Sequence, residues 1–240
     1  MSILNQIKLC KNKEDFYLKL NTFLVNKSKG YCCLVNPNIS LNCYKDIFYF
    51  KTLQSAAFNV CDAISIEIIN NLTKKRKIKS FPGPDIFREI TRNNFYSQFF
   101  IGGENENLLK SLRNNLKNPN FEMKDFYCPP FLNVEDFDYL EISKLINKNK
   151  PDIIWIGLGA PKQEIFMSKL LPHIDSGLMI GVGAAFNFYS GYKNHKRAPL
   201  FFRRYKVEWL FRLINEPKKT FPRVFRNIIY LPIILIKEFR

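Results

Sequence analysis

Short apolar runs alternate with helical patterns along most of this 240-residue chain, and this alternation limits the fold more than any other feature. The runs that are typical of strands cover residues 30–35, 57–60, 98–101, 121–128, 153–156 and 178–182. Helical patterns follow at residues 64–72, 104–116, 134–147 and from 162 onward. Strands that alternate with helices in this way form crossover units, which build parallel sheets. We therefore expect an α/β fold, with a mostly parallel sheet core and helices on both of its faces.

Polar residues and glycines follow the ends of the predicted strands. In a parallel sheet the carboxyl ends of the strands share one edge, and ligands of such folds bind beyond that edge. We therefore expect the residues after the strands to converge on one site. They are Asn36, Asp62, Gly102, Gly103 and the turns at residues 157–163 and 183–187.

The turn after the fifth predicted strand, within PDIIWIGLGAPKQEIFMSKLL (residues 151–171), allows two interpretations. Gly157 and Gly159 let a ligand approach the backbone, and the start of the next helix offers free N–H groups. Gln163 and Glu164 either reach a bound sugar or base, or only stabilise the first turn of the helix. The turn has no GxGxxG pattern and no phosphate-binding lysine motif, so the residues alone leave both interpretations open.

The formal net charge of +16 indicates an anionic partner, and this charge is concentrated near the C-terminus. Residues 193–240 contain 13 Lys and Arg but only 3 Asp and Glu, interleaved with large apolar side chains. Three interpretations fit such a segment: nucleic-acid binding, docking on an anionic bilayer, or a helix that packs on the core with a solvated charged face.

Several classes of protein are disfavoured by the sequence. The six cysteines form no CxxC pattern and have no partnering histidine cluster, so neither a disulfide scaffold nor a zinc site is expected. The N-terminus carries no pattern of a secretory signal. The longest apolar run near the C-terminus, residues 228–236, contains Pro232 and is shorter than the roughly 20 residues of a membrane span. We expect a cytoplasmic protein that can attach to a membrane surface.

Four late motifs define a pattern: GLGAPKQE (157–164), GVGAAFNFYSG (181–191), KRAPLFFRRYKVEWLFRL (196–213) and EP (216–217). Four earlier segments, VNPN, CDAISI, GPDIF and FFIGG, precede them in a fixed order. Together they resemble the WecG/TagA/CpsF family, glycosyltransferase family 26, over about residues 30–225. The resemblance implies a Rossmann-like core of the GT-E type with a C-terminal helical appendage. We expect the core to cover residues 1–191 and a basic, amphipathic, membrane-associating appendage to cover residues 192–240.

The same resemblance implies an activity. Members transfer a sugar from a UDP-sugar to an acceptor linked to undecaprenyl diphosphate, in the synthesis of surface polysaccharides, at the cytoplasmic face of the membrane. Asp62 matches the general base of the family, which would take the proton of the acceptor hydroxyl in an inverting displacement. The alternative for Asp62 is an N-cap of the helix that follows. Asp85, in GPD, is expected to be a structural turn or cap residue.

Further residues are expected to bind substrate, either from their place at strand ends or from the resemblance. They are Asn36, Gly102, Gly103, Gly157, Gly159, Gln163, Asn187, Arg197, Arg212 and Arg223. Because the chain has no DxD motif and no histidine cluster, we expect cations rather than a metal to neutralise the leaving UDP, and no cofactor. The expected partners are a UDP-sugar, a polyprenyl-diphosphate-linked glycan and an anionic membrane surface. We expect no nucleic acid, because the basic segment carries the KRAP and EWL signature, and self-association into a homo-oligomer is left open.

Three positions depart from the family pattern. Leu34 stands where the family usually has Thr, Ser80 where it has Arg, and Asn187 where it has Asp. These departures leave the donor and acceptor sugars open. They also leave open an alternative: a catalytically weak relative that binds nucleotide-sugars or lipids.

Overall fold

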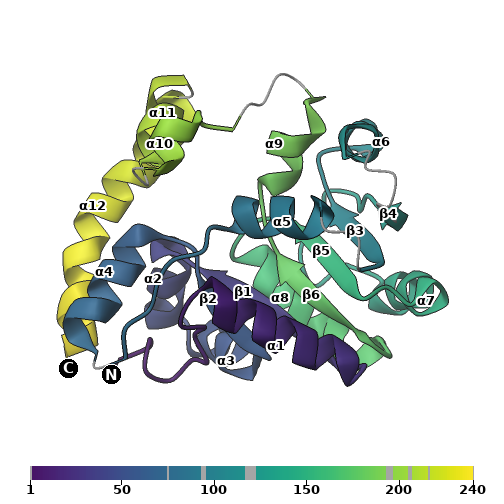
Figure 1. The fold of residues 1–240 in the computed structure, drawn as a ribbon, viewed down its shortest axis with the longest axis horizontal. Coiled ribbons are helices and arrows are strands. Elements are labelled where there is room, and N and C mark those ends of the chain that lie inside the picture. The colour runs from purple at the N-terminus through teal and green to yellow at the C-terminus, as the bar shows by residue number, and fades with distance from the viewer. Residues whose placement is uncertain are drawn as a thin grey trace.

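The structure, a computed structural model, describes residues 2–74, 76–92, 96–116, 123–192, 197–204, 207–215 and 217–239, without the side chains of residues 123, 124, 219 and 223. The described part contains one sheet of parallel strands in the order β2-β1-β6-β5-β3-β4 (Figure 1). Its strands are β1 (Lys29–Val35), β2 (Phe58–Cys61), β3 (Gln98–Gly102), β4 (Met123–Tyr127), β5 (Ile153–Gly157) and β6 (Gly177–Gly181). All six predicted strands and the α/β class are therefore confirmed.

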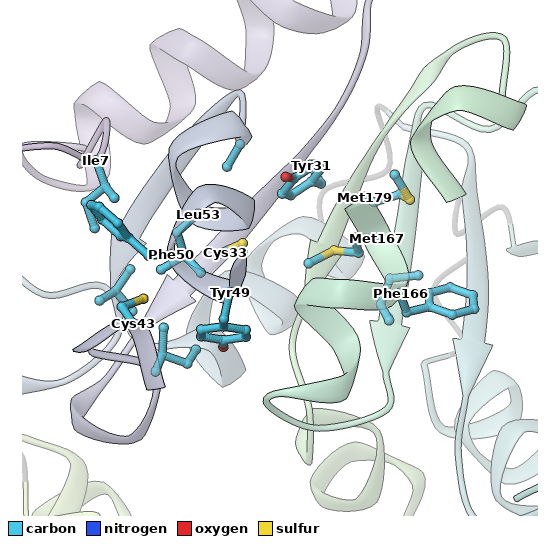
Figure 2. Packing of buried hydrophobic residues seen from close by; sticks show 14 of the residues in the cluster. Ile7, Tyr31, Cys33, Cys43, Tyr49, Phe50, Leu53, Phe166, Met167 and Met179 are labelled. Atoms are coloured by element: carbon cyan, nitrogen blue, oxygen red, sulfur yellow. The ribbon is translucent and has the colours of Figure 1, made fainter. Parts of the chain in front are cut away.

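Helices cover both faces of the sheet, as expected. Successive side chains of a strand point to opposite faces, so Cys33 and Val35 of β1 belong to one apolar cluster and Cys32 and Leu34 to the other. Helices on the first face are α2 (Pro37–Lys45), α3 (Ile47–Ser55), α4 (Ile64–Thr73), α7 (Tyr139–Asn149) and α8 (Lys162–Leu170), which the 3₁₀ helix η1 (Leu171–His173) follows. Figure 2 shows Tyr49 and Phe50 of α3 and Met167 of α8 in this cluster.

The second face is covered by α1 (Lys13–Val25), α5 (Gly83–Arg92), α6 (Glu106–Asn115) and α9 (Ala185–Ser190). Aromatic rings fill this layer: the ring of Phe87 lies 4.9 Å from that of Trp155 and 5.7 Å from that of Phe186. Because both faces are buried, the strands other than the edge strand β4 are mostly apolar, which is why the sequence shows them as apolar runs.

One predicted helix begins later than expected. The pattern at residues 134–147 predicts a helix from Val134, whereas α7 begins at Tyr139. The Asp138 side chain accepts a hydrogen bond from the backbone N–H of Glu141 and so caps the helix there.

Three helices form the C-terminal part: α10 (Leu200–Arg204), α11 (Glu208–Asn215) and α12 (Pro217–Phe239). The last apolar run lies within one helix, because α12 continues through Pro222 and Pro232. Its contacts with the core compensate for the hydrogen bonds that the prolines remove, and Ile234 is fully buried against the first face. No helix in the described ranges is long and apolar enough to cross a membrane.

The C-terminal end of α12 is fixed to the core by Glu238, whose exposed fraction is 1%. One carboxylate oxygen, Oε1, accepts hydrogen bonds from the Tyr44 hydroxyl and from the backbone N–H groups of Ile3 and Leu4. The other, Oε2, lies 3.2 Å from the Lys74 ammonium group. The last turn of α12 therefore joins the N-terminal segment, α2 and α4, and Figure 1 shows the two chain ends close together.

Candidate active site

Asp62 follows β2 at the carboxyl edge of the sheet, and two other elements hold its carboxylate. The backbone N–H of Gly83, the first residue of α5, donates to Asp62 Oδ1 at 2.7 Å. The Asn36 side-chain amide donates a long hydrogen bond of 3.5 Å to Oδ2. Asn36 is itself fixed, because its Oδ1 accepts from the backbone N–H groups of Asn38 and Ile39 and caps α2. The structure therefore brings Asn36 and Asp62 together, as expected.

The structure excludes the alternative role of Asp62 as a helix cap. The residue at the N-cap of α4 is Ala63, and no side chain makes a capping hydrogen bond there. Burial of the carboxyl group raises the pKa of Asp62, against the opposing effect of the Gly83 and Asn36 hydrogen bonds. A raised pKa makes a carboxylate a stronger base, which suits a group that accepts a proton during a reaction.

Two charged side chains of α11 act on Asp62 across the edge of the sheet. The Arg212 charge lowers the pKa of Asp62 and the Glu208 charge raises it, both as smaller effects than burial. Arg212 Nη2 lies 3.8 Å from Glu208 Oε2, and the guanidinium carbon lies 4.6 Å from the centre of the Phe188 ring of α9. The C-terminal part therefore contributes charge to the site around Asp62.

Arg197 joins this C-terminal part to the core. Its side chain is 8% exposed and donates two hydrogen bonds to the Asp85 carboxylate, each 2.8 Å long. It also donates to the Tyr189 hydroxyl at 2.7 Å and to Glu208 Oε1 at 3.1 Å. Asp85 is thus structural, as expected, through an ion pair that the sequence did not indicate. The structure gives Arg197 the role of a clamp between α5, α9 and α11, and its substrate contact stays a prediction.

Gln163 connects the turns that follow β5 and β6. Its side-chain oxygen accepts hydrogen bonds from the backbone N–H groups of Gly159, at 3.2 Å, and Gly183, at 3.1 Å. Its side-chain nitrogen donates to Glu164 Oε1 at 2.7 Å, and the residue is 4% exposed. The side chain therefore faces the two turns, and any effect of Gln163 on a bound donor would reach it through their shape.

Glu164 points into the protein, so of its two interpretations the structure favours a stabilising role over contact with a bound sugar or base. It is fully buried, and the Tyr49 hydroxyl donates to its Oε2 at 3.0 Å. Burial raises the pKa of Glu164, and the hydrogen bonds from Gln163 and Tyr49 oppose this shift. The two donors orient the carboxylate, which in turn orients the Gln163 amide.

The glycines at the carboxyl edge of the sheet are needed for different physical reasons. A Cβ atom on Gly102 would lie 2.8 Å from the backbone of Gly157, and one on Gly157 would lie 2.6 Å from the Phe186 ring. These two glycines are therefore required by close packing between neighbouring elements. Gly103 and Gly159 have positive φ angles of 90° and 77°, and a Cβ on Gly159 would meet no atom within 4 Å. Gly159 is thus the glycine whose surroundings are open to a ligand.

The three departures from the family pattern lie in different surroundings. Leu34 is buried beside Gly83, where a Cβ on Gly83 would lie 2.6 Å from Leu34 Cδ1. The Ser80 hydroxyl donates to Glu67 of α4 at 2.6 Å. Asn187 is half-buried in α9. The Arg223 side chain lies outside the described residues, so its expected contact stays a prediction.

Sequence reasoning did not assign a role to several residues that shape this site. They are Tyr49, Gly83 and Glu208, together with the ion-pair role of Asp85. The GPD and EWL motifs contain three of the four and were a usable signal, whereas Tyr49 lies in a segment without any motif. Among the described residues, no group of three or more His, Cys, Asp or Glu side chains is arranged to hold a metal ion.

The fold and the site define a class: a doubly wound α/β protein with a carboxylate and a cation at the carboxyl edge of its sheet, where such folds bind ligands. The model of the "Glycosyl transferase WecG/TagA/CpsF family" matches residues 2–240. The chain belongs to this family, and the resemblance seen in the sequence is confirmed.

Curated relatives carry one enzyme name, N-acetylglucosaminyldiphosphoundecaprenol N-acetyl-beta-D-mannosaminyltransferase. The relative from Bacillus subtilis (strain 168) is 30% identical over 187 residues, which cover 76% of this chain and 70% of the relative. That from Bacillus spizizenii is 27% identical over 210 residues, covering 85% and 79%. That from Staphylococcus aureus (strain MW2) is 27% identical over 207 residues, covering 83% and 78%.

Proposed function

We propose that this protein is an inverting glycosyltransferase that moves a sugar from a UDP-sugar to an acceptor linked to undecaprenyl diphosphate. The observation that carries this proposal is Asp62, held at the carboxyl edge of the sheet by Gly83 and Asn36 and not used as the N-cap of α4, the helix that follows it. The names of the relatives make N-acetylmannosamine the first donor sugar to test and N-acetylglucosaminyl-diphospho-undecaprenol the first acceptor.

In the proposed step, an acceptor hydroxyl oxygen attacks the anomeric carbon of the donor. The bond between that carbon and the UDP oxygen breaks, and UDP leaves with the electron pair. Asp62 accepts the hydroxyl proton, which requires an ionised carboxylate before the step. A single displacement inverts the anomeric configuration. The long Asn36 hydrogen bond leaves Oδ2 the less engaged oxygen, so we assign the proton to Oδ2.

The leaving UDP carries negative charge, which the protein must stabilise. Arg212 lies on α11 at the same edge as Asp62, and its side chain is 39% exposed. A guanidinium group binds phosphate oxygens well, so Arg212 is the described cation that we assign to the diphosphate. The open surroundings of Gly159, in the turn before α8, give the donor a second approach to the edge.

The test is a transfer assay with purified protein, candidate UDP-N-acetylhexosamines and the lipid-linked acceptor. We expect UDP release that depends on the acceptor, and a lipid product longer by one sugar whose new linkage is inverted. Acceptor-independent hydrolysis alone, or binding without release for every donor, would contradict the proposal and support a binding role.

We also propose that α10 to α12 dock the protein on the cytoplasmic face of an anionic membrane, as the acceptor requires. Large apolar side chains stand exposed along these helices: Phe201, Trp209, Phe221, Phe225, Ile228, Ile229, Ile236 and Phe239. Positions 221, 225, 228, 229 and 236 recur at helical spacing and form a stripe on α12. Exposed apolar side chains beside basic residues fit a bilayer interface.

A further inference from the structure

A chain of contacts leads from Asp62 to α11, and the charge at its end acts back on Asp62. Asp62 is bound by the N–H of Gly83, and Asp85 lies two residues further along α5. Asp85 binds Arg197 through two hydrogen bonds of 2.8 Å, and Arg197 donates to Glu208 at 3.1 Å. Glu208 pairs with Arg212 one helical turn later, at 3.8 Å. The Arg212 charge then acts on Asp62, which closes the ring.

Asp62, Asp85, Arg197, Glu208 and Arg212 form this ring, and among its carboxylates Glu208 is the one that contacts both Arg197 and Arg212. It is the first residue of α11 and is 21% exposed, so the ion pair to Arg197 fixes the start of the helix. The same carboxylate uses its other oxygen for Arg212. A carboxylate that shares a guanidinium group in this way limits how strongly the cation can interact with a second carboxylate nearby.

We propose that Glu208 is a positioning residue of the transferase: it holds part of the Arg212 charge, so that Asp62 remains a base and does not become a fixed counter-ion of Arg212. The role rests on the proposed function, because it concerns the same proton transfer. The inference goes beyond the proposed function by assigning a task to a second carboxylate, which is not the base. Without Glu208, the Arg212 guanidinium group would interact more strongly with the Asp62 carboxylate and lower its basicity.

Besides burial, four groups act on the pKa of Asp62. Asn36 at the start of α2 and the Gly83 N–H of α5 donate hydrogen bonds and lower the pKa of Asp62. Arg212 lowers it further, and Glu208 raises it. Removal of Glu208 therefore acts in one direction by two routes: a negative charge is lost, and Arg212 is released toward the carboxylate.

The experiment is a titration of the Asp62 carboxyl group by ¹³C NMR, assigned by comparison with Asp62→Asn. Four proteins are compared with the wild type: Glu208→Gln, Arg212→Gln, the double variant, and Glu89→Gln as a control. Glu89 is an ion-paired carboxylate of α5 that is 26% exposed and binds Lys13 and Tyr17, so its loss changes the net charge equally without touching the ring.

We expect Glu208→Gln to lower the pKa of Asp62, Arg212→Gln to raise it, and Glu89→Gln to leave it unchanged. In the Arg212→Gln background, Glu208→Gln should have less than half of its effect. An unchanged Asp62 titration in Glu208→Gln overturns the proposal, and so does an equal shift in both backgrounds, which would indicate only a direct charge effect. Glu208→Gln could also loosen α11, and Arg212→Gln then remains a test, because it leaves the Arg197 ion pairs intact. An Asp62 pKa that does not rise in Arg212→Gln overturns the proposal.

Transfer kinetics separate this inference from the proposed function. The low-pH limb of the kcat/KM profile should move with the NMR titration in each variant. A wild-type protein without transfer would contradict the proposed function while the NMR result still decides the role of Glu208. An active Glu208→Gln variant whose kcat/KM profile keeps the low-pH limb of the wild type would contradict the role of Glu208 and leave the proposed function standing.

Discussion

Arg197 and Asp85 form two parallel hydrogen bonds of 2.8 Å between the C-terminal part of the chain and the first turn of α5. Gly83, two residues before Asp85, binds the carboxylate of Asp62. The contact that holds the C-terminal helices is therefore made on the same helix start that holds the proposed base. A displacement of the C-terminal helices is therefore expected to disturb the position of Asp62.

Replacing Arg197 tests this link. Arg197→Met leaves Asp85 and Glu208 without their shared partner, and we expect a loss of about 2 kcal/mol or more in the free energy of unfolding. Arg88→Met is the matched control, because Arg88 meets the same Asp85 carboxylate at 3.3 Å and is 28% exposed. Its loss should be below about 1 kcal/mol. Urea unfolding measures both, and equal losses would show that the Arg197 contact has no special weight.

Gln163 should affect the donor site through the two turns that it joins. Gln163→Ala leaves the N–H groups of Gly159 and Gly183 without their acceptor, so we expect a loss of about 1–3 kcal/mol in stability and a raised KM for the donor. The control is Asn147→Ala on α7. The Asn147 side chain accepts a hydrogen bond from the backbone N–H of Asp175 and donates one to the backbone carbonyl of His173, away from the carboxyl edge of the sheet. A donor KM that rises equally in both variants would contradict a role of the turns in donor binding.

Glu164 predicts a pH dependence of stability. Burial raises its pKa in the folded protein, so between the ordinary and the raised pKa the folded state binds more protons than the unfolded state. The free energy of unfolding should therefore fall as the pH rises from the ordinary glutamate value through the folded value, and then level off. Glu164→Gln removes this contribution, so the difference between the two proteins should change with pH in that window. A difference that is constant from pH 4 to 8 would contradict it.

The exposed stripe of α12 should bind anionic vesicles. Phe221→Ser with Phe225→Ser removes two rings that stack at 6.1 Å on the outside of the helix and are 60% and 57% exposed. We expect flotation with anionic vesicles to fall at least tenfold, because two aromatic side chains no longer enter the interface. Leu18→Ser with Val25→Ser on α1 is the control, since those side chains are at least as exposed, at 67% and 80%, on a helix of the opposite face. Flotation that is the same in both variants would contradict membrane docking by α12.

The sequence was sufficient for the sheet and for the place of Asp62. Strands buried on both faces are mostly apolar, and the residue after each strand must lie at the carboxyl edge, so local patterns determine these features. α12 was harder to predict, since Pro232 is a local signal for a break. The contacts that hold the helix on the core, such as those of Glu238 with Tyr44 and Ile3, join residues 194 and 235 positions apart.

The orientation of Gln163 could not be predicted for the same reason. Its place in the first turn of a helix is compatible with a side chain that faces a ligand or the protein. The acceptor role is fixed by Gly183, 20 residues later, and by Glu164, which Tyr49 orients from 115 residues earlier. Only the packing of α3 against α8 brings these groups together, and no local pattern reports it.

The most direct test of the central claim is the turnover of Asp62→Asn with a UDP-sugar and the lipid-linked acceptor. The amide keeps the size of the side chain and can still accept from Gly83, but it cannot take the acceptor proton. We predict that kcat falls by about 10²- to 10⁴-fold while the affinity for the UDP-sugar stays within a few-fold of the wild type. A variant that retains near wild-type turnover would show that Asp62 is not the base and would contradict the account.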